Sequence, residues 1–202
     1  MKLIGLYDSP YVRRVAVSMR LQGFAFEHVA LSVFRHIDAM REINPLVKVP
    51  MLVLDNGDKL IESSLILDYL DGEVAPEQRL IPASGPARRQ VQQHCAIALV
   101  AMEKAVQVYY ETENRPKEFS YAAWAERCTG QMHDAFAMLE AMPASPLLSG
   151  AVITQADVTT AIALRFARHM HPAHFPTGRY PKLERLSAHC EALPAFIETP
   201  LE

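Results

Sequence analysis

A change in hydrophobic periodicity near residue 80 constrains the fold more than any other feature of the sequence. Before it, short apolar runs typical of strands alternate with apolar residues at helical spacing. The strand-like runs are 2–7, 26–31, 50–54 and 59–61, and the helical ones are 10–22, 34–43 and 63–71. After it, only helical spacing recurs. This order predicts an α/β domain with the pattern βαβαββα, followed by an all-α domain.

A cluster of proline and glycine residues separates the two patterns. Its members are Pro76, Pro82, Gly85 and Pro86. Such a cluster is typical of a linker, so we expect domains at 1–78 and 86–202 joined by a linker at 79–85. In the second domain, apolar stripes predict helices at 91–114 and 124–142, with further helices beginning near 154 and 181.

Charge and composition exclude several classes of function. The 202 residues carry a formal charge of −3, and the isoelectric point is near 6.2. Nucleic-acid binding needs a basic face, so it is not expected. No apolar run approaches the roughly 20 residues that span a bilayer, and the first residues do not resemble a signal peptide. Three cysteines at wide spacing predict neither disulfides nor a metal site. We expect a cytoplasmic protein with no membrane, nucleic-acid or metal partner.

The first motif with chemical potential is Ser9-Pro10, where a strand pattern passes into a helix. Serine followed by proline is a favoured pair for the N-cap and first position of a helix. One interpretation is therefore that Ser9 caps the helix and has no other role. Alternatively its hydroxyl also faces a cleft. There, together with the positive end of the helix dipole, it would stabilise a thiolate.

A second motif, Lys48-Val49-Pro50, opens the third strand pattern. Proline has no N–H for the sheet ladder, so it usually lies at an edge or at the start of a strand. If the bond before Pro50 is cis, the backbone of Val49 is turned outward and can pair with an extended peptide.

A third motif, Glu62-Ser63-Ser64, precedes the next helix. Either serine can serve as a simple N-cap. A hydroxyl and N–H groups at a helix N-terminus can also hold a carboxylate, and Glu62 suits an ammonium group. One amino acid carries both of these charges.

A fourth motif is structural. Thr154 and Asp157 have the spacing of a capping box, and Ile153 and Val158 have that of a hydrophobic staple. We assign this motif to folding.

Together these segments resemble the glutathione transferase family over nearly the whole chain. They are Ser9 to Val15, Asn44-Pro45 with Lys48-Val49-Pro50, Glu62-Ser63-Ser64, Leu148 to Asp157, and Pro181 to Phe196. Each segment alone is a weak signal, but their joint occurrence in this order is specific. The resemblance implies a thioredoxin-like first domain, an all-helical second domain and a homodimer.

The resemblance also implies a glutathione site. In it, Val49 pairs its backbone with the cysteinyl residue beside a cis bond at Pro50, while Glu62 and Ser63 hold the γ-glutamyl end. Ser9, in its Ser-Pro-aromatic-x-Arg context, points at the sulfur. Tyr7 is the alternative activator, since some branches of the family use a tyrosine near this place. Arg35 or His36 would contact the glycine carboxylate.

An acceptor pocket between the domains is implied as well, with Tyr11, Val12 and Tyr110 as candidates. The expected activity is that of a detoxification enzyme, which activates the glutathione thiol through Ser9 and adds it to a small hydrophobic electrophile. Glutathione is then a co-substrate, and no metal is needed. Two alternatives remain: a glutathione-dependent disulfide reductase, and a non-catalytic interaction or regulatory module of the same fold.

Overall fold

A computed structural model describes residues 1–143, 147, 148 and 150–201. The chain divides into two compact units, Met1–Ala83 with Leu193–Glu202, and Ser84–Ala192. The α/β domain followed by an all-α domain is confirmed. The sequence-based bounds placed residues 193–202 with the helical domain. In the structure this segment groups with the first unit, where its helix contacts the first helix of the chain. The sequence does not predict this grouping, because a local pattern contains no information on long-range contacts.

The first unit follows the predicted order βαβαββα. Its elements are β1 (Lys2–Ile4), α1 (Pro10–Leu21), β2 (Glu27–Val29), α2 (Ile37–Ile43), β3 (Met51–Val53), β4 (Lys59–Ile61) and α3 (Ser63–Gly72), then η1 (Pro76–Gln78) and the C-terminal α8 (Pro194–Ile197). The strands are shorter than the apolar runs that predicted them.

The four strands form one mixed sheet in the order β2-β1-β3-β4. β1 runs parallel to β2 and antiparallel to β3, which is antiparallel to β4. In this register Ile4 lies opposite Met51, and Met51 lies opposite Ile61. The C-terminal ends of β1 and β4 therefore meet the start of β3 at the same end of the sheet.

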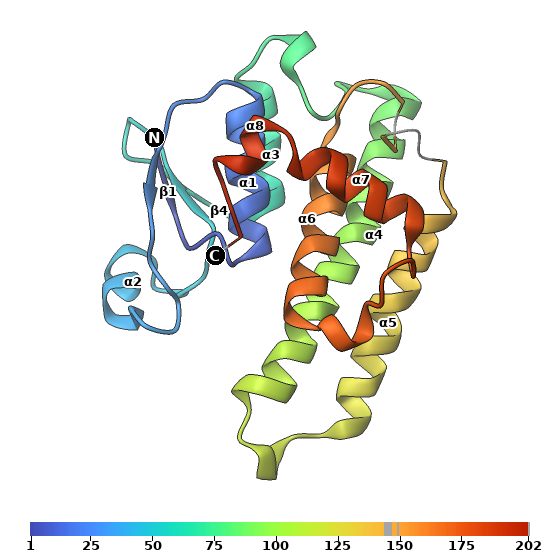
Figure 1. The fold of residues 1–202 in the computed structure, drawn as a ribbon. Helices are drawn as coiled ribbons and strands as arrows, with labels where there is room; N and C mark the ends of the chain where they lie inside the picture. The colour runs from blue at the N-terminus through green and yellow to red at the C-terminus, as the bar shows by residue number, and fades with distance from the viewer. Residues whose placement is uncertain (144–146, 149, 202) are drawn as a thin grey trace. The chain divides into compact units, whose positions relative to one another are not determined.

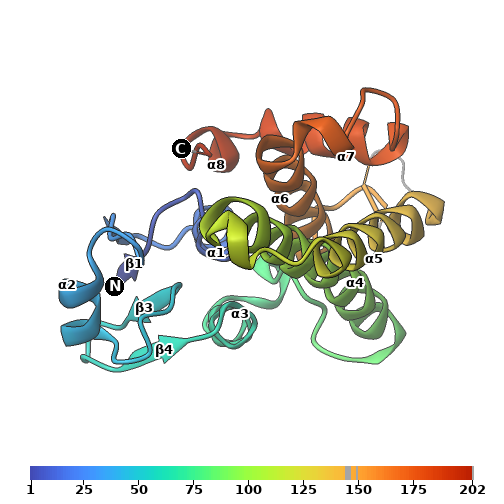
Figure 2. The ribbon, with the colours of Figure 1, turned by 90° about the horizontal axis from the view of Figure 1, so that it is seen from below.

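Helices cover both faces of this sheet (Figure 2). Leu3 and Leu52 belong to a core that includes residues of α1 and α3. Their neighbours Ile4 and Met51 pack with Met40 of α2 on the other face. The division follows from the strand period of two, which turns successive side chains to opposite faces.

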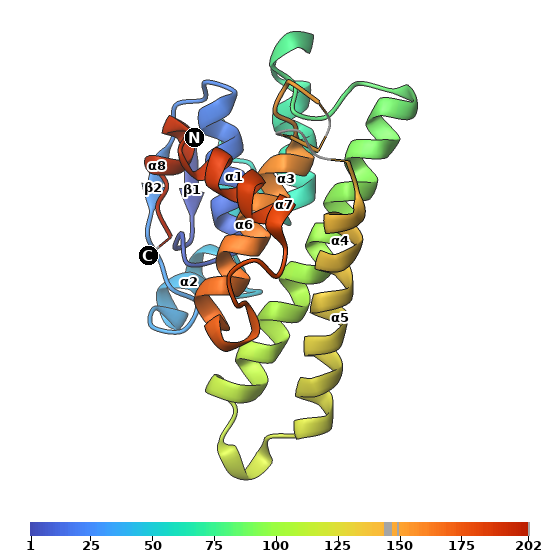
Figure 3. The ribbon, with the colours of Figure 1, turned by 45° about the vertical axis from the view of Figure 1, so that its right-hand side comes forward.

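The second unit is a bundle of α4 (Gly85–Tyr109), α5 (Ala122–Ala141), α6 (Gln155–Met170) and α7 (Pro181–Glu191), with the short helices η2 (Tyr110–Asn114), η3 (Lys117–Phe119) and η4 (Pro172–His174). α4 and α5 run side by side, and α6 packs on α4 (Figure 3). The predicted capping box of α6 is confirmed. Asp157 accepts a hydrogen bond of 2.8 Å from the backbone N–H of Thr154, and another of 2.7 Å from that of Leu148.

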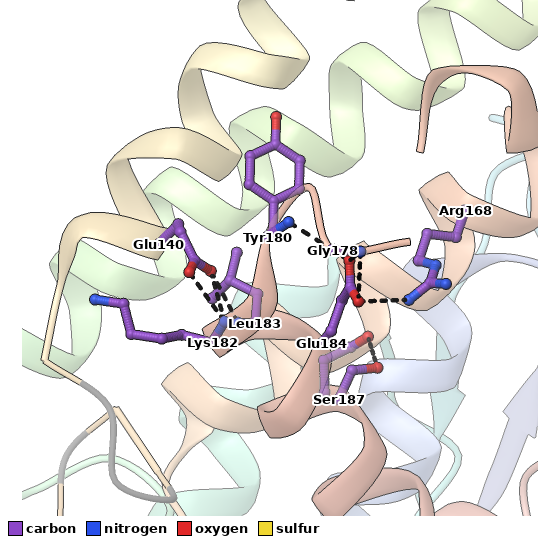
Figure 4. A network of polar contacts seen from close by, with 9 residues as sticks. Glu140, Arg168, Gly178, Tyr180, Lys182, Leu183, Glu184 and Ser187 are labelled. Carbon is purple, nitrogen blue, oxygen red and sulfur yellow. Dashed lines mark hydrogen bonds and ion pairs between the residues drawn. The ribbon is translucent and has the colours of Figure 1, made fainter. Parts of the chain in front are cut away.

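Carboxylates hold the start of α7 (Figure 4). Glu140 of α5 accepts hydrogen bonds from the backbone N–H groups of Lys182 and Leu183. Glu184 accepts from the N–H of Gly178 and lies 4.0 Å from the guanidinium of Arg168. Both acids satisfy backbone donors at or just before the N-terminus of a helix, where negative charge is favoured.

Cys95, Cys128 and Cys190 are buried thiols, and none forms a disulfide. Among the described residues, no helix combines the length and the apolar character that crossing a bilayer requires. Nor do three or more His, Cys, Asp or Glu side chains of this part of the chain gather in a way that would hold a metal ion.

Candidate functional site

The sheet register brings the three sequence motifs to one end of the first unit. β1 leads through Gly5 into the turn before Ser9, β3 begins directly after Pro50, and β4 leads directly into Glu62. Since Ile4, Met51 and Ile61 are neighbours across the sheet, the residues that follow or precede them lie at one edge. Two helix N-termini, those of α1 and α3, begin at this edge.

Ser9 is the N-cap of α1. Its backbone is extended, with φ −72° and ψ 117°, and its hydroxyl oxygen accepts a hydrogen bond of 3.4 Å from the backbone N–H of Val12. This distance is long for an N–H···O bond, so the cap is weak. Among the described residues, no atom accepts a hydrogen bond from the hydroxyl of Ser9. The half-buried side chain can therefore donate to a ligand while it caps the helix.

Tyr7, the alternative activator, is buried in the core on the α1 face of the sheet. Its ring stacks on that of His28, with 3.9 Å between the ring centroids and 5° between the planes. The nitrogen Nε2 of His28 in turn lies 2.7 Å from the carbonyl oxygen of Gly5. The ring of Tyr7 thus packs against His28, and the choice between Ser9 and Tyr7 as activator stays a prediction.

The Val49–Pro50 peptide bond is cis, as the resemblance implies. The loop before it is fixed by Asn44, a buried side chain that donates to the carbonyl of Lys48 at 2.8 Å and accepts from the N–H of Leu46 at 3.1 Å. Val49 itself is half-buried and Pro50 is buried.

Gly5 is a site residue to which sequence reasoning gave no role. Its φ of +129° lies where side chains are strained, and a Cβ there would come within 2.5 Å of Cγ2 of Val12 and 3.0 Å of Cβ of Val49. Only glycine lets the end of β1 approach both α1 and the entry to β3 this closely. The sequence does contain an indication of this role, since a glycine in a strand pattern often marks a close approach of another chain segment.

Glu62, and neither Ser63 nor Ser64, is the N-cap of α3. Its carboxylate accepts from the backbone N–H groups of Ser64 at 3.1 Å and Leu65 at 3.3 Å. The expectation of a simple serine cap is therefore wrong. The unusual φ of +72° at Glu62 places the carboxylate of Glu62 over the first turn of α3. Ser63 is buried, and its hydroxyl lies 3.4 Å from the carboxylate of Glu62.

Arg14 connects the α1 and α3 ends of the site. It is buried on α1, and its Nη1 donates to the hydroxyl oxygens of Ser63 at 3.1 Å and Ser64 at 3.4 Å. A guanidinium beside hydroxyls at a helix N-terminus favours a bound carboxylate. Arg14 lies within the segment Ser9 to Val15 that carries the family resemblance, but local spacing gives it no role, since its partners come from another helix.

The two basic candidates for the glycine carboxylate, Arg35 and His36, have different surroundings. Partial desolvation raises the pKa of the Asp8 carboxyl, while the backbone N–H of Ser9 and the positive charge of Arg35 act in the opposite direction. Arg35 therefore lies close enough to the residue preceding Ser9 to affect it. The Nδ1 of His36 accepts from the backbone N–H of Ser32 at 3.0 Å and stabilises its own loop.

The three candidates for an acceptor pocket differ in exposure. Val12 is 0% exposed and belongs to the core on the α1 face of the sheet. Tyr11 is half-buried in the first turn of α1. Tyr110, in the second unit, opens the π-helical turn η2 and is exposed. Pocket roles for all three residues stay predictions.

Comparisons with known proteins identify both parts of the chain. The family model for the glutathione S-transferase N-terminal domain matches residues 3–78, and that for the C-terminal domain matches residues 122–189. An Escherichia coli protein described as the uncharacterized GST-like protein YibF is 34% identical over 71 residues, which cover 35% of each chain. In this alignment, and in those with glutathione S-transferases of Arabidopsis thaliana, the chain matches about a third of the relative's length.

Two other relatives align over most of their length. A probable maleylacetoacetate isomerase 2 of Drosophila melanogaster is 27% identical, covering 91% of this chain and 80% of that protein. A glutathione transferase family member from Pseudomonas fluorescens, solved with bound glutathione, is 30% identical. It has a TM-score of 0.88 and covers 100% of this chain and 98% of its own. The same family member was also solved with S-(propanoic acid)-glutathione, with a TM-score of 0.83.

Proposed function

Because this chain belongs to the glutathione transferase family, we propose that it binds reduced glutathione and adds its thiol to a small hydrophobic electrophile. The observation that carries the proposal is the shared sheet edge, at which Ser9, Val49-Pro50 and Glu62-Ser63 meet two helix N-termini. The Pseudomonas relative solved with glutathione supports the choice of ligand.

Thiol activation is the task of Ser9. A free thiol has a pKa of about 8.5, so only a few per cent is ionised at neutral pH. The hydroxyl of Ser9 donates to the thiolate, and the N-terminus of α1 adds a favourable potential. Both favour the charged form and lower the thiol pKa. The proton leaves to solvent, and the sulfur lone pair forms the new bond to an electrophilic carbon. In a substitution the leaving group departs with its bonding pair, and in an addition the π-bond pair moves to the neighbouring atom, which takes up a proton from solvent.

Recognition of the glutathione peptide uses residues next to β3 and β4. The backbone of Val49 pairs with the cysteinyl residue as an added strand would. Ser63, with Arg14 behind it, receives the γ-glutamyl carboxylate, and the carboxylate of Glu62 receives the ammonium group. Arg35 is the proposed contact for the glycine carboxylate.

A second candidate reaction is glutathione-dependent isomerisation. The nearly full-length likeness to the Drosophila isomerase favours it. It uses the same activated thiol, which adds to an unsaturated carbon and later leaves, so glutathione is regenerated. Mass spectrometry of the products separates the two reactions, since only conjugation leaves glutathione attached. Mixed-disulfide chemistry is less favoured, because position 9 is serine rather than cysteine.

The first test is calorimetric titration with reduced glutathione, compared with the variants Ser63→Ala and Glu62→Gln. Binding that weakens at least tenfold in both variants supports the site. If the wild-type protein binds no glutathione at several millimolar, the proposal fails, and the search turns to a non-catalytic interaction module.

The second test separates Ser9 from Tyr7. Ser9→Ala should lower kcat by about 10²-fold or more, as loss of a single donor to a developing charge does elsewhere, and should leave the glutathione Kd within about threefold because recognition lies elsewhere. Tyr7→Phe is the matched control, since it keeps the stacked ring. An active Ser9→Ala together with an inactive Tyr7→Phe would assign the activation to Tyr7.

We also propose a homodimer, as the family resemblance implies. Leu46 and Leu65 of the first unit are 61% and 55% exposed, and burial of such apolar surface stabilises an interface. Light scattering should give twice the mass of the chain for the wild type. A monomeric mass for the wild type would reject the dimer. The expected cytoplasmic location stays a prediction.

A further inference from the structure

The end of the chain is built into the first unit. Residues 193–202 follow the helical bundle in sequence, yet they group with residues 1–83. Their short helix α8 lies beside α1 (Figure 1). A segment so distant in sequence is therefore placed against the helix that begins at Ser9.

Arg13 makes the central contact with this segment. It is 1% exposed. Its Nε donates to the carbonyl oxygen of Thr199 at 2.7 Å, and its Nη2 lies 3.5 Å from that of Phe196. The guanidinium carbon also lies 5.7 Å from the centroid of the Phe196 ring. These carbonyls belong to the C-terminal end of α8 and the turn after it, where a positive charge is favoured.

The acceptor side of this contact is itself held in place. Thr199 is completely buried, and its hydroxyl donates to the carbonyl of Ala195 at 2.9 Å. A buried guanidinium is costly unless its donors meet oriented acceptors. The geometry of Arg13 and the conformation of residues 195–199 therefore depend on each other.

Arg13 also belongs to the first turn of α1. Its backbone N–H donates to the carbonyl oxygen of Ser9 at 2.9 Å. The side chain of Arg13 is thus anchored in the C-terminal segment, while its backbone closes the turn that carries the Ser9 hydroxyl. Any rotation or slide of this turn would move that hydroxyl.

We propose that Arg13 is a positioning residue, which uses the C-terminal segment to fix the first turn of α1 and so aims the Ser9 hydroxyl at the glutathione sulfur. This inference rests on the proposed function. It gives residues 195–199 a part in thiol activation without contact to the substrate.

A second contact of the same segment provides the control. Arg20, two turns further along α1, lies 3.4 Å from the carboxylate of Glu198, and the two side chains are 38% and 53% exposed. An exposed ion pair contributes little to stability. Arg20 is also remote from Ser9 along the helix, so Arg20→Gln should leave thiol activation unchanged.

The experiment compares Arg13→Met, Arg13→Lys and Arg20→Gln with the wild type. Absorbance of the thiolate against pH gives the pKa of bound glutathione, and steady-state kinetics with an electrophile that the wild type turns over give kcat and KM. In Arg13→Met, we expect the thiol pKa to rise by about half a unit or more and kcat to fall about tenfold, because small displacements of a catalytic group are costly. The KM for glutathione should stay within about twofold. Arg13→Lys, with a charge but no planar fork, should lie in between.

The outcomes are distinct. A folded Arg13→Met with wild-type thiol pKa and kcat would overturn the inference. Failure of both Arg13 variants to fold would overturn it as well, because Arg13 would then be needed for folding only. If the wild type itself does not lower the thiol pKa of bound glutathione, the proposed activation by Ser9 fails, independently of Arg13.

Discussion

Arg13 and Arg14 are adjacent in the sequence, and both are buried, but their guanidinium groups have different partners. Successive residues of a helix point about 100° apart. One arginine therefore reaches backbone carbonyls of the C-terminal segment, and the other reaches hydroxyls at the start of α3. Two arginines that are neighbours in the sequence are therefore two buried anchors on one helix.

The backbone conformation at Gly5, with φ of +129°, likewise requires one residue type. Gly5→Ala should destabilise the protein and weaken glutathione binding, because the new Cβ would meet Val12 at 2.5 Å and Val49 at 3.0 Å. Overpacking of this kind costs about 1–3 kcal/mol. Urea unfolding and calorimetric titration measure the two effects.

Gly57→Ala is the control for Gly5. Gly57 also has a positive φ, +92°, but no atom lies within 4 Å of a Cβ built there. It should lose stability only through backbone strain, of order 1 kcal/mol, and bind glutathione normally. Equal binding losses in both variants would refute a packing role for Gly5.

At the scale of elements, the start of α6 depends on one buried carboxylate. Asp157 accepts hydrogen bonds from the backbone N–H groups of Leu148 and Thr154 and from the hydroxyl of Thr154, at 2.7 to 2.8 Å. It is 0% exposed. The capping box therefore joins the helix to the loop before it, in addition to capping the helix N-terminus.

Asp157→Ala should lower the free energy of unfolding by about 2–4 kcal/mol, since it removes a cap and leaves buried donors unsatisfied. Urea denaturation of the folded variant measures this loss. Asp134→Ala, on the exposed surface of α5, should change stability by less than about 0.5 kcal/mol. A loss at position 157 no larger than that at position 134 would contradict the role of the box.

At the scale of the whole molecule, the two units contain buried or half-buried groups whose titrations change stability in opposite directions. In the second unit, desolvation lowers the pKa of His94 and His171, and lowers that of His133 to about 4. The Nδ1 of His133 lies 2.9 Å from the hydroxyl of Tyr180. In the first unit, desolvation raises the pKa of Asp71, which accepts from the backbone N–H groups of Leu80 and Ile81.

The second unit should therefore lose stability first in acid. As the pH falls from 6.5 towards 4, the unfolded chain binds protons at His133 that the folded state does not, so stability decreases. For Asp71 the folded state binds the proton at higher pH than the unfolded chain does, so its contribution rises as the pH falls. Urea midpoints between pH 7 and 4, read from Trp124 in α5 and from circular dichroism, test this difference. His133→Gln should flatten the dependence, and an unchanged slope in that variant would exclude His133 as the cause.

The sequence by itself determined the order of the elements, the α/β and all-α division, the Ser9 cap and the Thr154–Asp157 box, and its family resemblance implied the glutathione motifs. Periodicity and capping depend on residues a few positions apart, so they can be read locally. Tertiary structure alone decided which strand ends meet, that Gly5 must have no side chain, and that Glu62 replaces the serines as the cap. It also joined Arg13 to Thr199, 186 residues away. Such contacts depend on how packed elements bury their polar groups, which local spacing does not encode.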